Sequence, residues 1–456
     1  MLFLLLLTLE ENEMRIPKRV IGHIINSYKT VLKKYRFINI FSTMLISLAL
    51  STEYSGTALA IDYVVDKNTH WIEYTLENYG HRGARVIHGG DTLTILNDSI
   101  ITFDFNDSSS ATPFIEGGFI ISSEDARTPG DVSVKGGTII GKSAKSGKGY
   151  GVISYSDYPS NITLTNTNLK LEDFESGIRA GNGKIKITNN EMIFDRIPFS
   201  VYTFRGGEID IQSNKFTINE GYLGIYSRND SFVNIHIGNE MKLDSQHSGI
   251  ITENKAKVVM QSPSITLNCP YAINARDNSS VSVDADVVNA TAQSVVYSKN
   301  EAKINFSVKK SGTIQGNVEA HDSSNISFGL HGNTEWAGGA LKDDTANVQV
   351  ALGNKSVWHV KPMHVKGVEY LTSAISLLRL EGGTVDFAST QEYQKLIVGE
   401  LTGNGGTFRL KVEKDTADGV DQVDITRYDS GNNSIYVASS GNTEISAEEM
   451  NTYLVR

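Results

Sequence analysis

Acidic side chains recur at the ends of successive apolar runs in the middle of the chain. The series consists of Glu172 or Asp173, Asp195, Glu220 and Asp244, and Asn268 continues it. Carboxyls ~5 Å apart suit retaining glycoside hydrolysis, and a pair ~10 Å apart is near the inverting separation. Asp195, Glu220 and Asp244 would be the catalytic residues of such a glycan-cutting enzyme. Turns favour Asp and Asn in any case, and this interpretation is preferred.

Metal or cofactor binding has little support in the sequence. The same acids could supply oxygen ligands for calcium, but no loop of fixed ligand spacing accompanies them. Residues Gly136–Ser143 fit the G-x-x-x-x-G-K-[ST] phosphate-loop pattern, yet that loop requires a following helix, and a Gly-, Lys- and Ser-rich segment follows instead. We therefore predict no metal and no cofactor, and we assign no catalytic residue.

Three tyrosines form a candidate binding surface. Tyr202, Tyr226 and Tyr297 each follow an apolar residue of the buried type, so they should point outward from one face. Tyr202 and Tyr226 are expected to stack in neighbouring repeats. Such a row could bind sugar rings or a partner surface. Cross-strand aromatic pairs also stabilise a sheet without any ligand, which is the favoured interpretation.

The composition limits the class of protein. The chain has 456 residues, 42 Lys and Arg against 52 Asp and Glu, and a net charge of −10, which argues against nucleic-acid binding. Its hydrophobic content of 39% with 41 Gly is too rich for disorder. Cys269 is the single cysteine, so no intramolecular disulfide exists, and we expect its side chain in the core.

A repeat of ~24 residues organises the middle of the chain, and such a period indicates a solenoid. Apolar anchors occur at Gly151–Ser154, Gly177–Ala180, Ser200–Thr203, Gly224–Ser227, Gly249–Thr252, Ala272–Ala275 and Val295–Ser298, and their second residues stand 26, 23, 24, 25, 23 and 23 apart. Two further alternating runs follow each anchor, as in Ile209/Ile211 and Phe216/Ile218. Alternation at period two indicates strands, and no helical period interrupts it.

Parallel strands without crossover helices predict an all-β protein, a right-handed, three-faced parallel β-helix in which each repeat forms one coil. We place this β-helix at residues 86–355 and an N-terminal cap at 61–85. A lone coil buries too few side chains to offset its conformational entropy, so stability must come from stacking.

The first sixty residues have the layout of an extended secretory signal. A basic run at Arg15–Arg36 precedes an apolar stretch at Phe37–Leu50, and Ala58 and Ala60 form an A-x-A site with cleavage expected after Ala60. The unusual start Met1–Glu13 makes Met14 the alternative initiator. An uncleaved anchor is the competing interpretation of the segment.

The C-terminal part changes character and resembles a known family. The resemblance is carried by Ser356–Val360, Ile375–Phe387, Leu396–Val398, Leu401–Leu410 and Asp421–Thr426. These runs are similar to the C-terminal end of autotransporter passenger domains of the pertactin and AIDA type. The resemblance implies a cap or junction at residues 356–440 and leaves 441–456 as a tail. Family members continue into an outer-membrane β-barrel, which is absent from this sequence.

The resemblance implies an exported surface adhesin or cell–cell interaction protein that binds through an extended surface. Its partner would be a host-cell or bacterial surface protein or glycan, or a second copy of the chain. A polysaccharide-degrading enzyme and an inactive truncated autotransporter are the alternatives. The resemblance implies a cell-surface, outer-membrane or extracellular location, and we expect a periplasmic location if the chain is expressed as written.

Overall fold

The computed structural model describes strands β1 to β6 and then residues 131–143, 149–155, 161–365, 367–389, 392–412, 420–428 and 431–439. Every element in these segments is a strand. Among the described residues, no helix has the length and apolarity needed to cross a membrane. The expected signal region with Ala58 and Ala60, and the tail at 441–456, lie outside the described residues.

The strands follow one another along the chain, and all but β26 and β27 belong to one sheet of parallel pairs. The N-terminal strands are β1 (Asp62–Val65), β2 (Thr69–Ile72), β3 (Arg85–Ile87), β4 (Thr92–Ile95), β5 (Ile100–Phe105), β6 (Phe119–Ser122), β7 (Val132–Lys135), β8 (Thr138–Ser143) and β9 (Tyr150–Tyr155). The middle strands are β10 (Asn161–Thr165), β11 (Asn168–Glu172), β12 (Ser176–Gly181), β13 (Lys184–Asp195), β14 (Phe199–Phe204), β15 (Glu208–Arg228), β16 (Phe232–Glu253), β17 (Lys257–Asn268), β18 (Tyr271–Arg276), β19 (Ser280–Lys299) and β20 (Lys303–Ala320). The C-terminal strands are β21 (Asn325–Leu330), β22 (Asn333–Gly338), β23 (Ala340–Lys342), β24 (Asn347–Leu352), β25 (Val357–Val360), β26 (Met363–Val365), β27 (Val368–Tyr370), β28 (Thr372–Glu381), β29 (Thr384–Asp386), β30 (Lys395–Asn404), β31 (Thr407–Val412), β32 (Gln422–Tyr428) and β33 (Ser434–Ser439).

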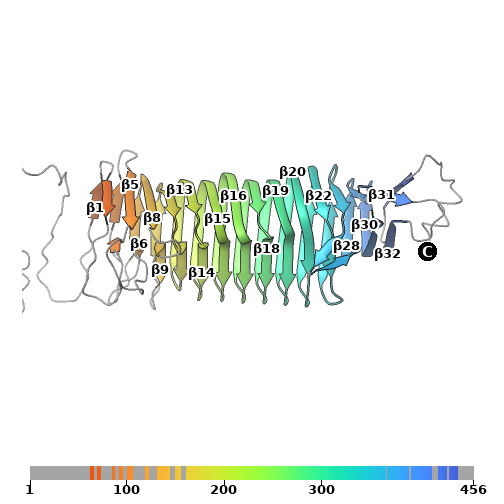
Figure 1. The fold of residues 1–456 in the computed structure, drawn as a ribbon, viewed down its shortest axis with the longest axis horizontal. Helices are drawn as coiled ribbons and strands as arrows, with labels where there is room; N and C mark the ends of the chain where they lie inside the picture. The colour runs from red at the N-terminus through yellow and green to blue at the C-terminus, as the bar shows by residue number, and fades with distance from the viewer. Residues whose placement is uncertain are drawn as a thin grey trace, which may run out of the picture. The chain divides into compact units, whose positions relative to one another are not determined.

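Figure 1 shows the strands of successive coils stacked side by side. Each coil pairs with the next through three parallel ladders, which define three faces. The first face runs through β9, β12, β14, β18 and the ends of β15, β16 and β19. The second runs through β10, β21 and β24 and the starts of the long strands, and the third through β8, β11, β22, β25, β29, β31 and β33. The all-β parallel solenoid expected from the repeat is confirmed.

The two ends continue the same ladders. Strands β1 and β2 lie in the range expected to cap the solenoid, and they already pair in parallel with β4 and β5. At the other end, β28 to β33 extend the ladders beyond residue 356. The exception is the hairpin of β26 and β27, which pair antiparallel with each other.

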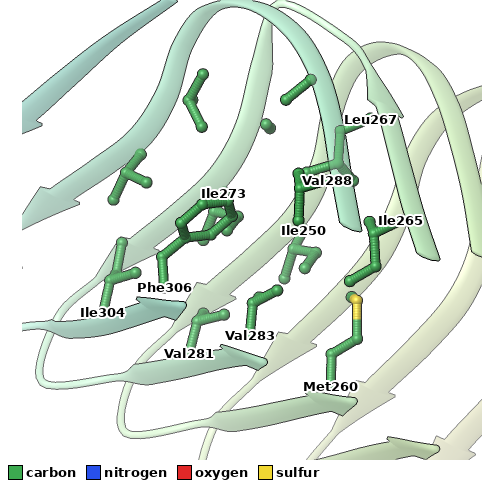
Figure 2. Close-up of a cluster of buried hydrophobic side chains, with 14 of the residues drawn as sticks. Ile250, Met260, Ile265, Leu267, Ile273, Val281, Val283, Val288, Ile304 and Phe306 are labelled. Carbon is green, nitrogen blue, oxygen red and sulfur yellow. The ribbon is translucent and has the colours of Figure 1, made fainter. Parts of the chain in front are cut away.

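The core is a set of vertical rows in which one apolar position repeats from coil to coil. On the second face one row passes in register through Ile162, Ile185, Ile209, Val233, Val258 and Val281. All of them are at most 2% exposed. Figure 2 shows side chains from successive coils, such as Met260, Val283 and Phe306, pointing into a common interior. This row is the one predicted from alternation at period two.

The corner between the first and second faces explains the Asn and Asp residues of the repeat. Two consecutive residues there have positive φ in coil after coil. The pairs are Asn229 and Asp230, Asn254 and Lys255, Asp277 and Asn278, Asn300 and Glu301, and Asp322 and Ser323. The amide of Asn254 donates to Oδ1 of Asn229 at 3.0 Å, and that of Asn300 to Oδ1 of Asp277 at 2.7 Å. Asn and Asp tolerate this left-handed conformation better than most residues, and here they also link the coils.

Truncation of one core side chain should cost the solenoid several kcal/mol. Ile235 is fully buried and stands in register between Ile211 and Met260. Its change to Ala leaves a cavity that two neighbouring coils must share, so Ile235→Ala should lower the free energy of unfolding by about 2–5 kcal/mol. Urea denaturation measures the loss, and Gln212→Ala, on the exposed side of the same face, is the matched control. Equal unfolding midpoints for the two variants would contradict the shared core.

Candidate functional site

The first face carries a row of neighbouring side chains, of which several are largely buried. In register, this row passes through Ile153, Arg179, Tyr202, Tyr226, Ile251, Asn274, Tyr297 and Glu319. The structure therefore places all three sequence-predicted tyrosines in one row. Tyr202 and Tyr226 are direct neighbours, whereas Asn274 and Glu319 flank Tyr297.

Tyr202 and Tyr226 form the expected stack. Their ring centroids are 5.2 Å apart and their planes differ by 9°. The guanidinium of Arg228 lies 5.4 Å from the Tyr202 ring centroid, and that of Arg179 lies 5.2 Å from the same centroid. Tyr202 is only 8% exposed as a result. The faces of these two rings are covered by each other and by the guanidinium groups, so little ring surface is accessible to a sugar. The main contribution of the pair is cross-strand stabilisation.

A second chain of rings continues along the same face, and sequence inspection missed most of it. It links Tyr222 to His247 at 5.3 Å, His247 to Tyr271 at 5.6 Å, Tyr271 to Tyr297 at 6.2 Å and Tyr297 to His321 at 5.6 Å. The planes in these pairs differ by 37–75°, and Tyr222 is 48% exposed. Tyr222, His247 and Tyr271 precede the anchor residues, so an alignment extended toward the N-terminal side of each anchor would have found them. We call the row from Ile153 to Glu319, together with the series of rings from Tyr222 to His321, the aromatic face.

Burial and hydrogen bonding fix the protonation of Tyr226. Its hydroxyl donates to Oε2 of Glu253 at 2.9 Å. The pKa of Tyr226 is raised to about 12, mainly by burial and further by the carboxylate of Glu253. Burial also raises the pKa of Tyr297. Both tyrosines are therefore neutral hydrogen-bond donors at physiological pH.

The acid series is only partly a column. On the third face, Glu172, Asp195 and Asn219 are in register, and Asp244 pairs with Asn268. Glu220 lies outside this ladder, because it has a φ of 53° at a point where the register between β15 and β16 shifts. The expectation that Glu220 stacks with Asp195 and Asp244 is therefore wrong, and the ladder position belongs to Asn219.

Cations neutralise the carboxylates that remain in this column. The guanidinium of Arg196 contacts Asp173 at 3.0 Å, Asp195 at 2.5 Å, and Glu172. The Lys142 ammonium donates to Glu172 at 2.7 Å. That hydrogen bond is the largest of the causes that lower the pKa of Glu172. A glycosidase acid needs a raised pKa at physiological pH, so Glu172 is unsuited to that role.

The phosphate-loop pattern forms a strand. Thr138–Ser143 is β8, whose backbone pairs in parallel with β5 and with β11. The backbone amides of β8 therefore belong to the pairing with β5 and β11, and no helix N-terminus follows in the described residues.

A hollow on the third face near the C-terminal end was not foreseen from the sequence. One row passes in register through His359, Asp386, Arg409 and Tyr436. Beside it lies a cavity of about 520 Å³, lined by Asp386, Ala388, Ser389, Thr407, Arg409 and Tyr436. These residues come from β29, the segment after it, β31 and β33, so only the stacking of three coils brings them together.

The carboxylate of Asp386 is held in place at the edge of this cavity. Its Oδ2 lies 3.0 Å from Nδ1 of His359, and its Oδ1 accepts from the amide of Ala388 at 3.1 Å. Burial works to raise the pKa of Asp386, but the hydrogen bond and charge of His359, the Ala388 amide and the charge of Arg409 together lower it. Asp386 is therefore ionised at neutral pH although it is only 6% exposed.

Comparison with known proteins finds a family match in the C-terminal part of the chain. Residues 375–455 match the family model described as Pertactin. The chain is also similar to the crystal structure of the autotransporter UpaB from E. coli, with 13% identity over 84% of this chain and 90% of that one and a TM-score of 0.30. Among curated proteins, none matches the chain.

The C-terminal part of the chain is thus similar to the Pertactin family, and it continues the parallel solenoid formed by the preceding coils. The resemblance found in the sequence is confirmed over residues 375–455.

The thiol of Cys269 should be unreactive in the folded protein. Cys269 is 5% exposed within the core, as expected, and burial raises its pKa to about 11. Since the thiolate is the reactive form, Ellman's reagent at pH 8 should modify the native protein far more slowly than the unfolded chain. In 8 M urea, ~1 thiol per chain should react at the rate of a free cysteine. Rapid modification of the native protein would show that the coil opens at this position.

Proposed function

We propose that this passenger domain acts as a surface adhesin or cell–cell interaction protein, and that the aromatic face is its contact surface. The observation that carries the proposal is the chain of rings from Tyr222 to His321, which crosses several coils on one face. Tyrosine and arginine are the residues most often responsible for binding energy at protein interfaces. Its partner would be a surface protein of a host or neighbouring cell.

The second face differs in chemistry, which supports the choice of the first. The central outward row there is mostly small and polar. It consists in register of Thr163, Lys186, Asp210, Asn234, Val259, Ser282, Asn305, Ser327 and Gln349. Such side chains hold water and lose rotamer freedom on contact, so they contribute less to binding than rigid aromatic rings.

We prefer a binding function over a catalytic one because the carboxylates of the third face are engaged in ion pairs. Arg196 occupies the space between Asp173, Glu172 and Asp195. A pair of carboxyls that divides the roles of acid and nucleophile needs two different environments. The ion pairs instead make these carboxylates parts of one charged network.

Attachment assays test the adhesin proposal. Tyr222→Ser and Tyr271→Ser change outward side chains, so the variants should fold and retain the β-type circular dichroism of the parent. Their binding to cells should weaken by at least about tenfold, the effect expected for hot-spot residues. Lys186→Ser, on the second face, is the matched control and should bind like the parent. Undiminished attachment of both tyrosine variants would remove the aromatic face as the contact surface.

The enzyme alternative has its own measurement. The parent chain should release no reducing sugar from a panel of glycans. The double variant Asp195→Asn, Glu220→Gln should attach to cells as well as the parent does. Release of sugar by the parent that disappears in the double variant would establish the hydrolase in place of the adhesin.

A further inference from the structure

We propose that the cavity beside Asp386, Arg409 and Tyr436 is a binding site for one or two sugar units of a neutral saccharide. The site goes beyond the adhesin proposal, because it lies on the third face and involves no residue of the aromatic face. The two proposals can therefore fail separately.

The polar lining has the chemistry that sugar hydroxyls require. The carboxylate of Asp386 is an acceptor, and its position is fixed by His359 and by the amide of Ala388. The neighbouring coil places Arg409 in register with it as a donor. Ser389 and Thr407 add hydroxyls that can both donate and accept. An acceptor beside a multiple donor can hold two adjacent hydroxyls of one sugar ring.

Arg409 is available for a ligand. Within the described residues its guanidinium makes no hydrogen bond or ion pair, and its side chain is exposed. This contrasts with Arg179, Arg196 and Arg228, which are engaged with rings or carboxylates. A guanidinium without such a partner, beside a cavity, is a ready donor.

Tyr436 supplies the apolar wall. It is 62% exposed, the highest value among the exposed large hydrophobic residues. Within the described residues no other aromatic ring packs on it, whereas Tyr202 and Tyr226 stack on each other at 5.2 Å. A ring with an open face can pack against the C–H surface of a sugar. Tyr436 is therefore better suited to saccharide binding than the stacked pair of Tyr202 and Tyr226.

Charge and size narrow the ligand class. Asp386 would repel a simple anion. Arg409 would repel a simple cation, and so would Lys361, whose ammonium donates to the carbonyl oxygen of Ser389 at 3.0 Å and to its hydroxyl at 3.2 Å. Charges of both signs at one cavity favour a neutral ligand with many hydroxyls. The volume of about 520 Å³ is within the ~300–1,000 Å³ that small-ligand sites span. The cavity is open on the outer side of the sheet, so an exported protein can reach a glycan with it.

Saturation-transfer NMR on the full chain tests the site, with methyl glucoside, methyl galactoside, methyl mannoside and lactose as probes. At least one probe should bind saturably, with a Kd of roughly 1 mM. Tyr436→Ala and Arg409→Gln should each weaken that binding by at least about tenfold. Tyr436→Phe keeps the ring and should bind as the parent does, and Tyr222→Ser, on the aromatic face, is the unrelated control.

Three results would overturn the inference. The first is the absence of saturable binding for all four sugars, and the second is unchanged binding in both Tyr436→Ala and Arg409→Gln. The third is displacement of the sugar by equimolar inorganic phosphate, because that result would indicate an anion site. Cell attachment measured on the same proteins separates the two proposals. A parent chain that attaches to cells but binds none of the four sugars rejects only this site. Loss of attachment in Tyr222→Ser with intact sugar binding supports both proposals, because the two surfaces then act independently.

Discussion

Parallel pairing of each coil with the next, without a shift in register over most of the chain, is the constraint on which the rest of the structure depends. It places residues about one repeat apart at adjacent ladder positions, as with Ile185, Ile209 and Val233. Apolar residues at one position therefore form a continuous core, and a polar residue there would lie between two buried neighbours. A single coil lacks this support, so folding and stability are properties of the stack.

The same rule determines what the surface can become. Where the register is kept, an outward residue lies beside the residue from the next repeat, so similar side chains gather in rows. Tyr202 and Tyr226 stack for this reason, and Asn254 bonds to Asn229 for the same reason. Rows of like charge would be destabilising, and the protein avoids one by placing Arg196 against Asp173. A surface built from rows suits extended contact with a partner more than chemistry at one point.

The C-terminal end departs from this regular pattern. The antiparallel hairpin of β26 and β27 interrupts the repeat, and the segment after β29 forms one side of a cavity. There the row His359, Asp386, Arg409 and Tyr436 consists of four different residue types. Neighbouring coils then bring unlike groups together, which is the condition for a small-ligand site. The six residues that line this cavity all lie within residues 375–455, which match the Pertactin model.

Alternation at period two and the recurring anchors were sufficient to predict the all-β solenoid, its core rows, the buried Cys269 and the stack of Tyr202 on Tyr226, because ladder neighbours are separated by a fixed number of residues. The sequence could not show that Glu220 leaves the ladder, since that depends on a local register shift and a positive φ. Nor could it show that Arg196 fills the acid column or that Asp386 and Tyr436 share a cavity. Those contacts depend on where side chains from different coils end in space, which only the tertiary structure decides.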